Sequence, residues 1–250
     1  MTNPNWVKEL QRKRHREYSQ GGQDGLIAFV FDNIGVTNRR CVEFGFNSDT
    51  ITGGTGANTA RLVQDEGWNQ LYFDALRENA QIRLYKRKLL PGNIASVFAE
   101  FEVPREIDYV SIDVDGIDLW LFRAMLQAGY RPRLVSVEYN SHFPLSVSAT
   151  VKPDTGSKLW TGGPVYGASL LALNRVASEF GYSLVCVEVP FDLFFVRNDL
   201  LTEVELLPVD FFSQSVRVFH HCRHSSEFTD FSDFVEYPSL FPVSFSWGWQ

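Results

Sequence analysis

Cysteine is scarce in this chain of 250 residues. The three cysteines, Cys41, Cys186 and Cys222, are odd in number and widely spaced. This usage argues against a disulfide framework and is typical of a reducing compartment. We therefore expect an intracellular protein, with the cytoplasm as its most direct location.

Long apolar runs are also lacking. No stretch approaches the roughly 18 uninterrupted apolar residues that a membrane-spanning helix needs. The first residues, Met-Thr-Asn-Pro-Asn-Trp, do not form a basic flank followed by an apolar run. Neither a membrane span nor a secretory signal is predicted.

Positive charge is not in excess. Lysine and arginine total 23 against 30 acidic residues, which gives a net charge of −7. A negative surface repels a polyanion, so nucleic acid is a poor candidate partner. The one basic cluster, Arg12 to Arg16, is interpreted as the solvated face of a helix.

Hydrophobic residues make up 44% of the chain, which is ample for a core. Short β-rich runs alternate with longer segments of helical period, and this alternation predicts an α/β fold with a mostly parallel sheet. The organisation predicted is a main domain over 1–200, followed by an aromatic-rich appendage over 201–250 that packs on the same domain. Seven strands are expected, over 40–44, 70–73, 82–86, 109–112, 134–137, 182–188 and 191–196.

Helices are expected over 25–33, 58–65, 117–128 and 167–180, and further helices are expected to begin near Leu76 and at Pro91. The last two strands are separated by little more than Val189 and Pro190, so they should pair as an antiparallel hairpin. The segment from Asn140 to Pro164 is predicted to be a long loop of the kind that forms lids or binding sites.

Carboxylates stand where four of the predicted strands end. Glu43 ends the first strand, Asp74 the second and Glu138 the fifth, while Asp113 and Asp115 follow the fourth. In open parallel sheets ligands bind beyond the carboxyl ends of the strands, so these side chains should meet at one crevice. Collected acids repel one another, which suggests that they bind ligand hydroxyls, a cation or a metal.

The loop after the first strand narrows the choice of ligand. An acid at the position of Asp74 can accept hydrogen bonds from the ribose of a nucleoside cofactor, either NAD or S-adenosylmethionine. No Gly-x-Gly-x-x-Gly follows the first strand, and Gly-Gly-Thr-Gly-Ala-Asn-Thr at 53–59 does not end as a phosphate loop does. A cofactor without a pyrophosphate is therefore favoured.

A series of short motifs follows one another between Tyr18 and Leu200: Tyr18-Ser19-Gln20, Gln23-Asp24-Gly25, Val42-Glu43-Phe44-Gly45, Ile112-Asp113-Val114-Asp115-Gly116, Arg133 to Asn140, Tyr166-Gly167-Ala168-Ser169-Leu170 and Phe194-Phe195-Val196-Arg197. In this order they resemble the FkbM-type methyltransferases and their uncharacterised relatives. The resemblance implies the class I, Rossmann-like methyltransferase fold, a doubly wound seven-stranded sheet with the last strand antiparallel. The implied activity is methyl transfer from S-adenosylmethionine to an oxygen of a small molecule or sugar.

By the same resemblance, the first strand end borders the methionine part of the cofactor, Asp74 the ribose, and Asp113 the transferred methyl. The predicted cofactor contacts are Glu43, Phe44, Gly45, Asn58, Thr59, Asp74, Ala75 and Asp113.

Two routes to acceptor activation remain open. Asp113 or Asp115, with Glu138 and Asn140, supplies the oxygen ligands of a divalent cation such as Mg²⁺. Alternatively Glu138 or His142 acts alone as the general base, without a metal. Asp113 is the third predicted catalytic residue. A purely structural role is as plausible as the metal: Asp115 then caps the next helix and Glu138 pairs with Arg133.

A different class of function is a catalytically silent methyltransferase-like subunit that serves as a scaffold, with the aromatic tail as its protein-binding surface. A nicotinamide oxidoreductase is disfavoured by the missing phosphate-binding turn. His220, His221, Cys222 and His224 match no zinc-finger spacing and are predicted to be surface residues.

Overall fold

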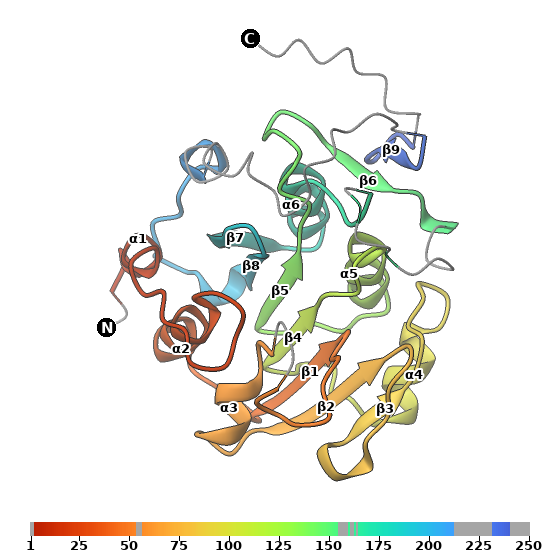
Figure 1. The fold of residues 1–250 in the computed structure, drawn as a ribbon. Helices are drawn as coiled ribbons and strands as arrows, with labels where there is room; N and C mark the ends of the chain where they lie inside the picture. The colour runs from red at the N-terminus through yellow and green to blue at the C-terminus, as the bar shows by residue number, and fades with distance from the viewer. Residues whose placement is uncertain are drawn as a thin grey trace.

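The fold is a central sheet with helices on both faces (Figure 1). The computed structural model describes residues 3–53, 57–154, 160, 163, 165–212 and 232–240. The sheet has seven strands in the order β3-β2-β1-β4-β5-β8-β7. All neighbours from β3 to β5 are parallel, whereas β8 runs antiparallel to both β5 and β7.

Six of the seven predicted strands closely match the observed ones: β1 (Arg40–Phe44), β2 (Asn69–Asp74), β4 (Tyr109–Ile112), β5 (Leu134–Glu138), β7 (Tyr182–Glu188) and β8 (Asp192–Arg197). The third predicted strand is shorter than expected, as β3 (Leu84–Lys86). The mostly parallel sheet and its antiparallel hairpin of β7 and β8 are thereby confirmed, and the arrangement is compatible with a Rossmann-like fold.

Two hydrophobic cores lie on opposite faces of the sheet because the strand residues alternate. In β4, Tyr109 joins one core while Val110 and Ile112 join the other. The first core receives α1 (Trp6–Leu10), α2 (Gln23–Ile34) and α3 (Ala60–Gln64). The second receives α4 (Ile94–Glu100), α5 (Asp118–Gln127) and α6 (Leu170–Glu179).

The helix expected near Leu76 is absent. Asp74 Oδ1 instead accepts the backbone N–H groups of Leu76 and Arg77, at 2.7 and 2.8 Å, and this bends the chain into a turn. A short 3₁₀ helix over Ala80–Ile82 follows. Side-chain capping by an acid therefore overrides helix propensity here.

The basic run over 12–16 was also misassigned, because α1 ends at Leu10 and the run lies in a turn and coil. Arg14 pairs with Glu188 at 2.6 Å and donates to Val187 O, so it ties this coil to the end of β7.

Part of the appendage returns to the main body. β9 (Phe234–Glu236) pairs antiparallel with β6 (Ala149–Val151), inside the segment that was predicted to be only a loop. Phe234 and Tyr237 belong to the same core as α5 and α6. The predicted surface residues His220, His221, Cys222 and His224 lie outside the described part of the chain.

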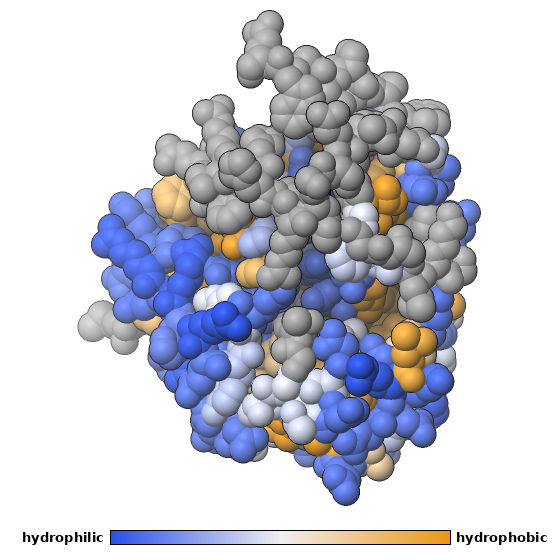
Figure 2. Space-filling view, in the orientation of Figure 1, coloured by the Kyte–Doolittle hydropathy of each residue, from blue (hydrophilic) through white to orange (hydrophobic). Residues whose placement is uncertain are grey.

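Among the described residues, no helix is long and apolar enough to cross a membrane. Hydrophilic residues cover most of the coloured surface in Figure 2, and hydrophobic ones show as separate groups. The largest exposed hydrophobic side chains include Leu76 and Trp160, and both line the cavity described below.

Candidate functional site

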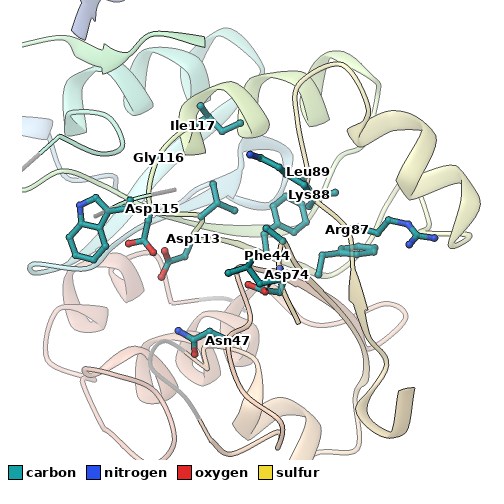
Figure 3. A pocket seen from close by; sticks show the side chains of 16 residues that line it. Phe44, Asn47, Asp74, Arg87, Lys88, Leu89, Asp113, Asp115, Gly116 and Ile117 are labelled. Carbon is teal, nitrogen blue, oxygen red and sulfur yellow. Dashed lines mark hydrogen bonds between the residues drawn. The ribbon is translucent and has the colours of Figure 1, made fainter. Parts of the chain in front are cut away.

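A cavity of about 270 Å³ opens where β1, β2 and β4 end (Figure 3). Its lining comes from four stretches of chain and one isolated aromatic: Phe44, Gly45 and Asn47; Phe73 to Leu76; Arg87 to Leu89; Asp113 to Ile117; and Trp160. This volume approaches the lower end of small-molecule sites. The position is the one expected of a ligand crevice in an open parallel sheet.

Gly45 allows the loops of two neighbouring strands to meet. Its φ is +74°, and a Cβ atom there would lie 1.7 Å from the carbonyl oxygen of Asp113. Any side chain would therefore push the β4 loop away from β1. Glycine keeps Asp113 against the end of β1, at the edge of the cavity.

Asp74 faces the cavity from the end of β2. Its Oδ1 holds the turn to Arg77, while Oδ2 takes part in none of the hydrogen bonds found among the described residues. The turn fixes the orientation of the carboxylate and leaves one oxygen available to a ligand hydroxyl.

Glu43, Asn58 and Thr59 do not line this cavity, although all three were predicted to contact the cofactor. Glu43 is buried, and its carboxylate accepts the N–H groups of Asn58 and Thr59, each at 3.0 Å, and the Thr59 hydroxyl at 2.5 Å. Burial raises the pKa of Glu43 to about 7 despite these bonds. In this structure the three residues anchor the chain that enters α3.

The β4 loop is a turn held by Asp118. Its Oδ1 accepts Val114 N–H at 2.8 Å and its Oδ2 accepts Gly116 N–H at 2.9 Å. Between these two anchors Asp115 has a φ of +54°, in the left-handed region. Asp115 is exposed, lines the cavity and does not cap α5, whose N-cap is Ile117. The capping role considered for Asp115 is thus wrong.

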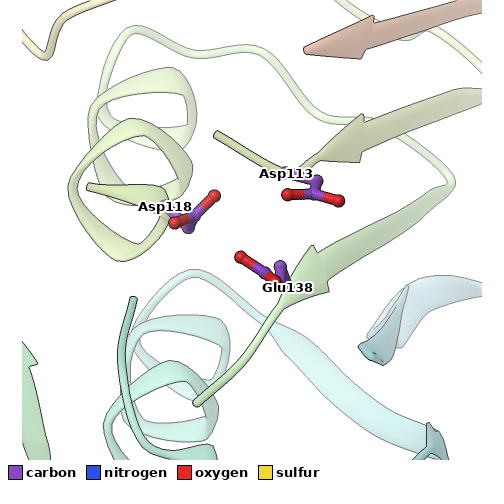
Figure 4. A group of neighbouring side chains, drawn as sticks. All are labelled: Asp113, Asp118 and Glu138. Carbon is purple, nitrogen blue, oxygen red and sulfur yellow. The ribbon is translucent and has the colours of Figure 1, made fainter. Parts of the chain in front are cut away.

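Three carboxylates converge between β4, β5 and the start of α5 (Figure 4). One oxygen from each of Asp113, Asp118 and Glu138 lies within 4.8 Å of the others. No ion pair involves any of the three among the residues that the structure describes. Arg133, considered as a partner for Glu138, instead lies 3.7 Å from Asp108, so that pairing is wrong.

The spacing of the three oxygens is compatible with a hard divalent cation. Ligand oxygens at about 2.4 Å from a Ca²⁺ ion are separated by at most about 4.8 Å when they lie on opposite sides of it. The predicted ligand Asp115 is not in the cluster, and its place is taken by Asp118, three residues further on at the start of α5. Asn140 Oδ1 accepts His142 N–H at 3.0 Å, and its Nδ2 donates to Tyr166 O at 2.8 Å.

Burial and mutual repulsion raise the pKa values of these acids. Desolvation is the first cause for Asp113 and Glu138, whose pKa values lie well above the usual range, and neighbouring carboxylates raise them further. The pKa of Asp118 rises to about 7, mainly through burial. Raised pKa values make these carboxylates stronger bases.

Aromatic side chains lie beyond β5. His142 and Tyr166 are in edge-to-face contact with ring centroids 6.1 Å apart, and Tyr166 meets Trp160 in the same way at 5.8 Å. His142 is not among the residues of the carboxylate cluster. Trp160 is the member of this group that lines the cavity.

Sequence reasoning missed Asp118, Asp192 and Trp160. Asp118 had a usable signal, since it is a third acid in Asp113-Val114-Asp115-Gly116-Ile117-Asp118. Asp192 begins a strand, and its approach to β5 depends on the antiparallel pairing of β8. Trp160 carries no signal, because it stands alone in a loop rich in glycine.

Comparison of the sequence with models of known protein families, and with curated proteins, found no match. Any assignment of function therefore depends on the motifs and geometry described above.

Proposed function

We propose that this protein is an S-adenosylmethionine-dependent methyltransferase that acts on an oxygen of a small molecule or sugar. The observation that carries the proposal is a cavity at the ends of β1, β2 and β4 that brings together Gly45, Asp74 and Asp113. The sheet order with a reversed β8 supports it, because the class I methyltransferase fold implied by the sequence motifs has this pattern.

The residues present fit the cofactor. Asp74 offers the unengaged Oδ2 to ribose hydroxyls, with Ala75 beside it on the cavity wall. Phe44 and Gly45 would border the methionine part of the cofactor, and Asp113 would lie toward its methyl group. When bound, S-adenosylmethionine supplies an electrophilic methyl group. Glu43, Asn58 and Thr59 support this wall from behind through their mutual hydrogen bonds.

The cluster next to the cavity provides for acceptor activation. Glu138, with Asp113 beside it, is positioned to accept a proton from an acceptor hydroxyl, since burial makes its carboxylate a stronger base. If a divalent cation such as Mg²⁺ takes part, Asp113, Asp118 and Glu138 would hold it, and it would lower the pKa of a bound hydroxyl. His142, the other base considered, packs against Tyr166 and does not line the cavity.

Calorimetric titration of the full chain tests the proposal. S-adenosylmethionine and S-adenosylhomocysteine are expected to bind with micromolar Kd, and NAD is expected not to bind. Repeating the titration with and without Mg²⁺ distinguishes the two activation routes. Absence of binding by both sulfur ligands refutes the proposal and favours the silent scaffold.

The cysteines support a proposal about the compartment. Cys41 and Cys186 are buried free thiols, and burial raises the pKa of both, which keeps them as inert thiols. We infer that the enzyme works in the cytoplasm.

A further inference from the structure

Three carboxylates lie side by side at one edge of the sheet, one after the end of β4, one at the end of β5 and one at the start of β8. Ile112 pairs with Val137, so the next residues along β4 and β5, Asp113 and Glu138, are neighbours. Glu138 in turn pairs with Asp192 of β8. We call Asp113, Glu138 and Asp192 the carboxylate row. Like charges opposite one another destabilise a sheet, so the row costs folding free energy.

The row is short of hydrogen-bond donors. Within the described chain, Asp113 and Glu138 accept no hydrogen bond, and Glu138 Oε2 is buried without a partner. Asp192 accepts two bonds, from Gln23 Nε2 at 2.9 Å and Asn58 Nδ2 at 3.2 Å, but both go to Oδ2. Buried acceptors normally find donors, so this shortage calls for an explanation.

Asn58 adds an independent acceptor to the same region. It is only 2% exposed, and its Nδ2 donates to Ser111 Oγ and to Asp192 Oδ2, which places the amide next to Asp192 of the row. Its Oδ1 is buried and has no partner among the described residues. The Asn58 amide oxygen and the carboxylates of Asp113 and Glu138 therefore all lack a hydrogen-bond donor. A positively charged group that donates hydrogen bonds would satisfy all three and would also neutralise the carboxylates.

Two observations favour an organic cation over a metal ion. Asp118, the third acid of the metal-like cluster, already accepts a backbone N–H with each oxygen, so only Asp113 and Glu138 bring oxygens without donors. Trp160 lines the same cavity as Asp113, and an indole face attracts an ammonium group. A primary ammonium has three N–H donors to share among the row.

We propose that the carboxylate row binds a protonated primary amine carried by the methyl acceptor. The ligand is thus an amine-bearing alcohol or amino sugar. That this ligand is the methyl acceptor rests on the proposed function, whereas the binding of an ammonium group to the row does not.

Matched pairs of small molecules test the site directly. Glucosamine is compared with glucose, and tyramine with 4-(2-hydroxyethyl)phenol, by ligand-observed NMR on the full chain without any cofactor. Each amine is expected to bind at least tenfold more tightly than its hydroxyl partner. Glu138→Gln should weaken amine binding at least fivefold, while Glu66→Gln, which neutralises an exposed glutamate in a turn, should leave it unchanged.

Asp192→Asn is the second variant, because an asparagine retains an oxygen for Gln23 and Asn58 and removes one charge from the row. Equal binding of amines and hydroxyls overturns the proposal. So does Mg²⁺ binding that requires Glu138 in a chain that does not prefer amines, since the row would then be a metal site. A chain that binds amines but not S-adenosylmethionine keeps the ammonium site and loses the methyltransferase.

Discussion

Asp74 combines two tasks in a single carboxylate, and the tasks use different oxygens. Oδ1 closes the turn after β2, and Oδ2 faces the cavity. A substitution that preserves the first oxygen separates the two tasks. Asparagine does so, because its amide oxygen can still accept the N–H groups of Leu76 and Arg77.

Asp74→Asn is expected to weaken S-adenosylmethionine binding by about tenfold to a hundredfold, since hydrogen bonds to a charged group contribute about 1.5–3 kcal/mol. Thermal stability should be little changed. Calorimetry measures the Kd, and Asp32→Asn, at an exposed acid of α2 that does not line the cavity, is the control. Unchanged affinity in Asp74→Asn would remove the proposed ribose contact.

Asp115 is a candidate for strain that is retained for function. Its left-handed backbone is imposed by the two hydrogen bonds that Asp118 makes on either side. Most residues occupy this region at a cost of about 1–2 kcal/mol, which is smaller for asparagine and aspartate. The same turn exposes the Asp115 carboxylate to the cavity.

We expect Asp115→Gly to be as stable as the parent chain or more stable by up to about 1 kcal/mol, and Asp115→Ala to be less stable than Asp115→Gly by a similar amount. Both variants lose the carboxylate, so both should show the same change in ligand affinity. Urea denaturation measures the first difference and calorimetry the second. Equal stabilities of the two variants would show that the turn carries no strain.

At the scale of elements, a buried acid fixes how α2 connects to β1. Asp108, immediately before β4, is fully buried. Its carboxylate accepts the N–H groups of Thr37, Asn38 and Arg39 at 2.7 to 3.0 Å and the Thr37 hydroxyl at 2.6 Å. A turn far away in sequence is thereby attached to the amino end of β4.

Asp108→Asn replaces one acceptor oxygen with an N–H₂ group that faces N–H donors. We expect the free energy of unfolding to fall by about 3 kcal/mol, the upper range for hydrogen bonds to a buried charge. Chemical denaturation measures the loss, and Asp32→Asn, on the exposed side of α2, serves as the control. A loss similar to that of the control would mean that other contacts hold the turn.

The elements that sequence reasoning predicted best are those buried on both faces. β4, β5, β7 and β8 are mostly apolar and buried along nearly their whole length, and their bounds were predicted to within a residue or two. Helix starts were less accurate, because local side-chain bonds decide them. Gly167 has a φ of +55° and Ser169 caps α6 by accepting Ala172 N–H, so the helix begins at Leu170 rather than Gly167.

At the scale of the whole molecule, the small sheet of β6 and β9 was beyond prediction. Each strand has three residues, and the pairing joins positions 85 residues apart, as in Thr150 with Val235. Three residues carry no detectable alternation. The crevice, in contrast, was predictable, because parallel strands end at one edge of a sheet. The position of Asp192 beside Glu138 was not predictable, because it depends on the long-range register of β8 with β5.

Phe234 tests whether the carboxyl-terminal segment belongs to the same core. The side chain is fully buried and meets Phe143 edge to face, with ring centroids 5.0 Å apart. Phe234→Ala should lower the free energy of unfolding by about 3–5 kcal/mol. Phe211→Ala, at a ring that is 44% exposed, should have a much smaller effect. Two separate unfolding transitions, with only the minor one shifted by Phe234→Ala, would instead assign the segment to an independent unit.

The buried acids also predict how stability depends on pH. Burial raises the pKa of Glu43 to about 7 and that of Asp192 to about 6, both above the values of an unfolded chain. Between about pH 4 and these values the folded state holds protons that the unfolded chain has lost. The contribution of these two groups to the free energy of unfolding is therefore fully present below about pH 4. It falls as pH rises toward 7, by about 1.4 kcal/mol per pH unit for each such proton.

Asp192→Asn isolates one of these protons, because the variant keeps its acceptor for Gln23 and Asn58 but no longer titrates. Between about pH 4 and 6 its free energy of unfolding should decline less steeply than that of the parent chain, by about one proton's contribution. Above pH 7 the variant should be the more stable, since one charge of the carboxylate row is gone. Urea denaturation across this range measures both slopes; parallel slopes would mean that Asp192 is ionised in the folded protein throughout, and that a cation or donor already neutralises the row.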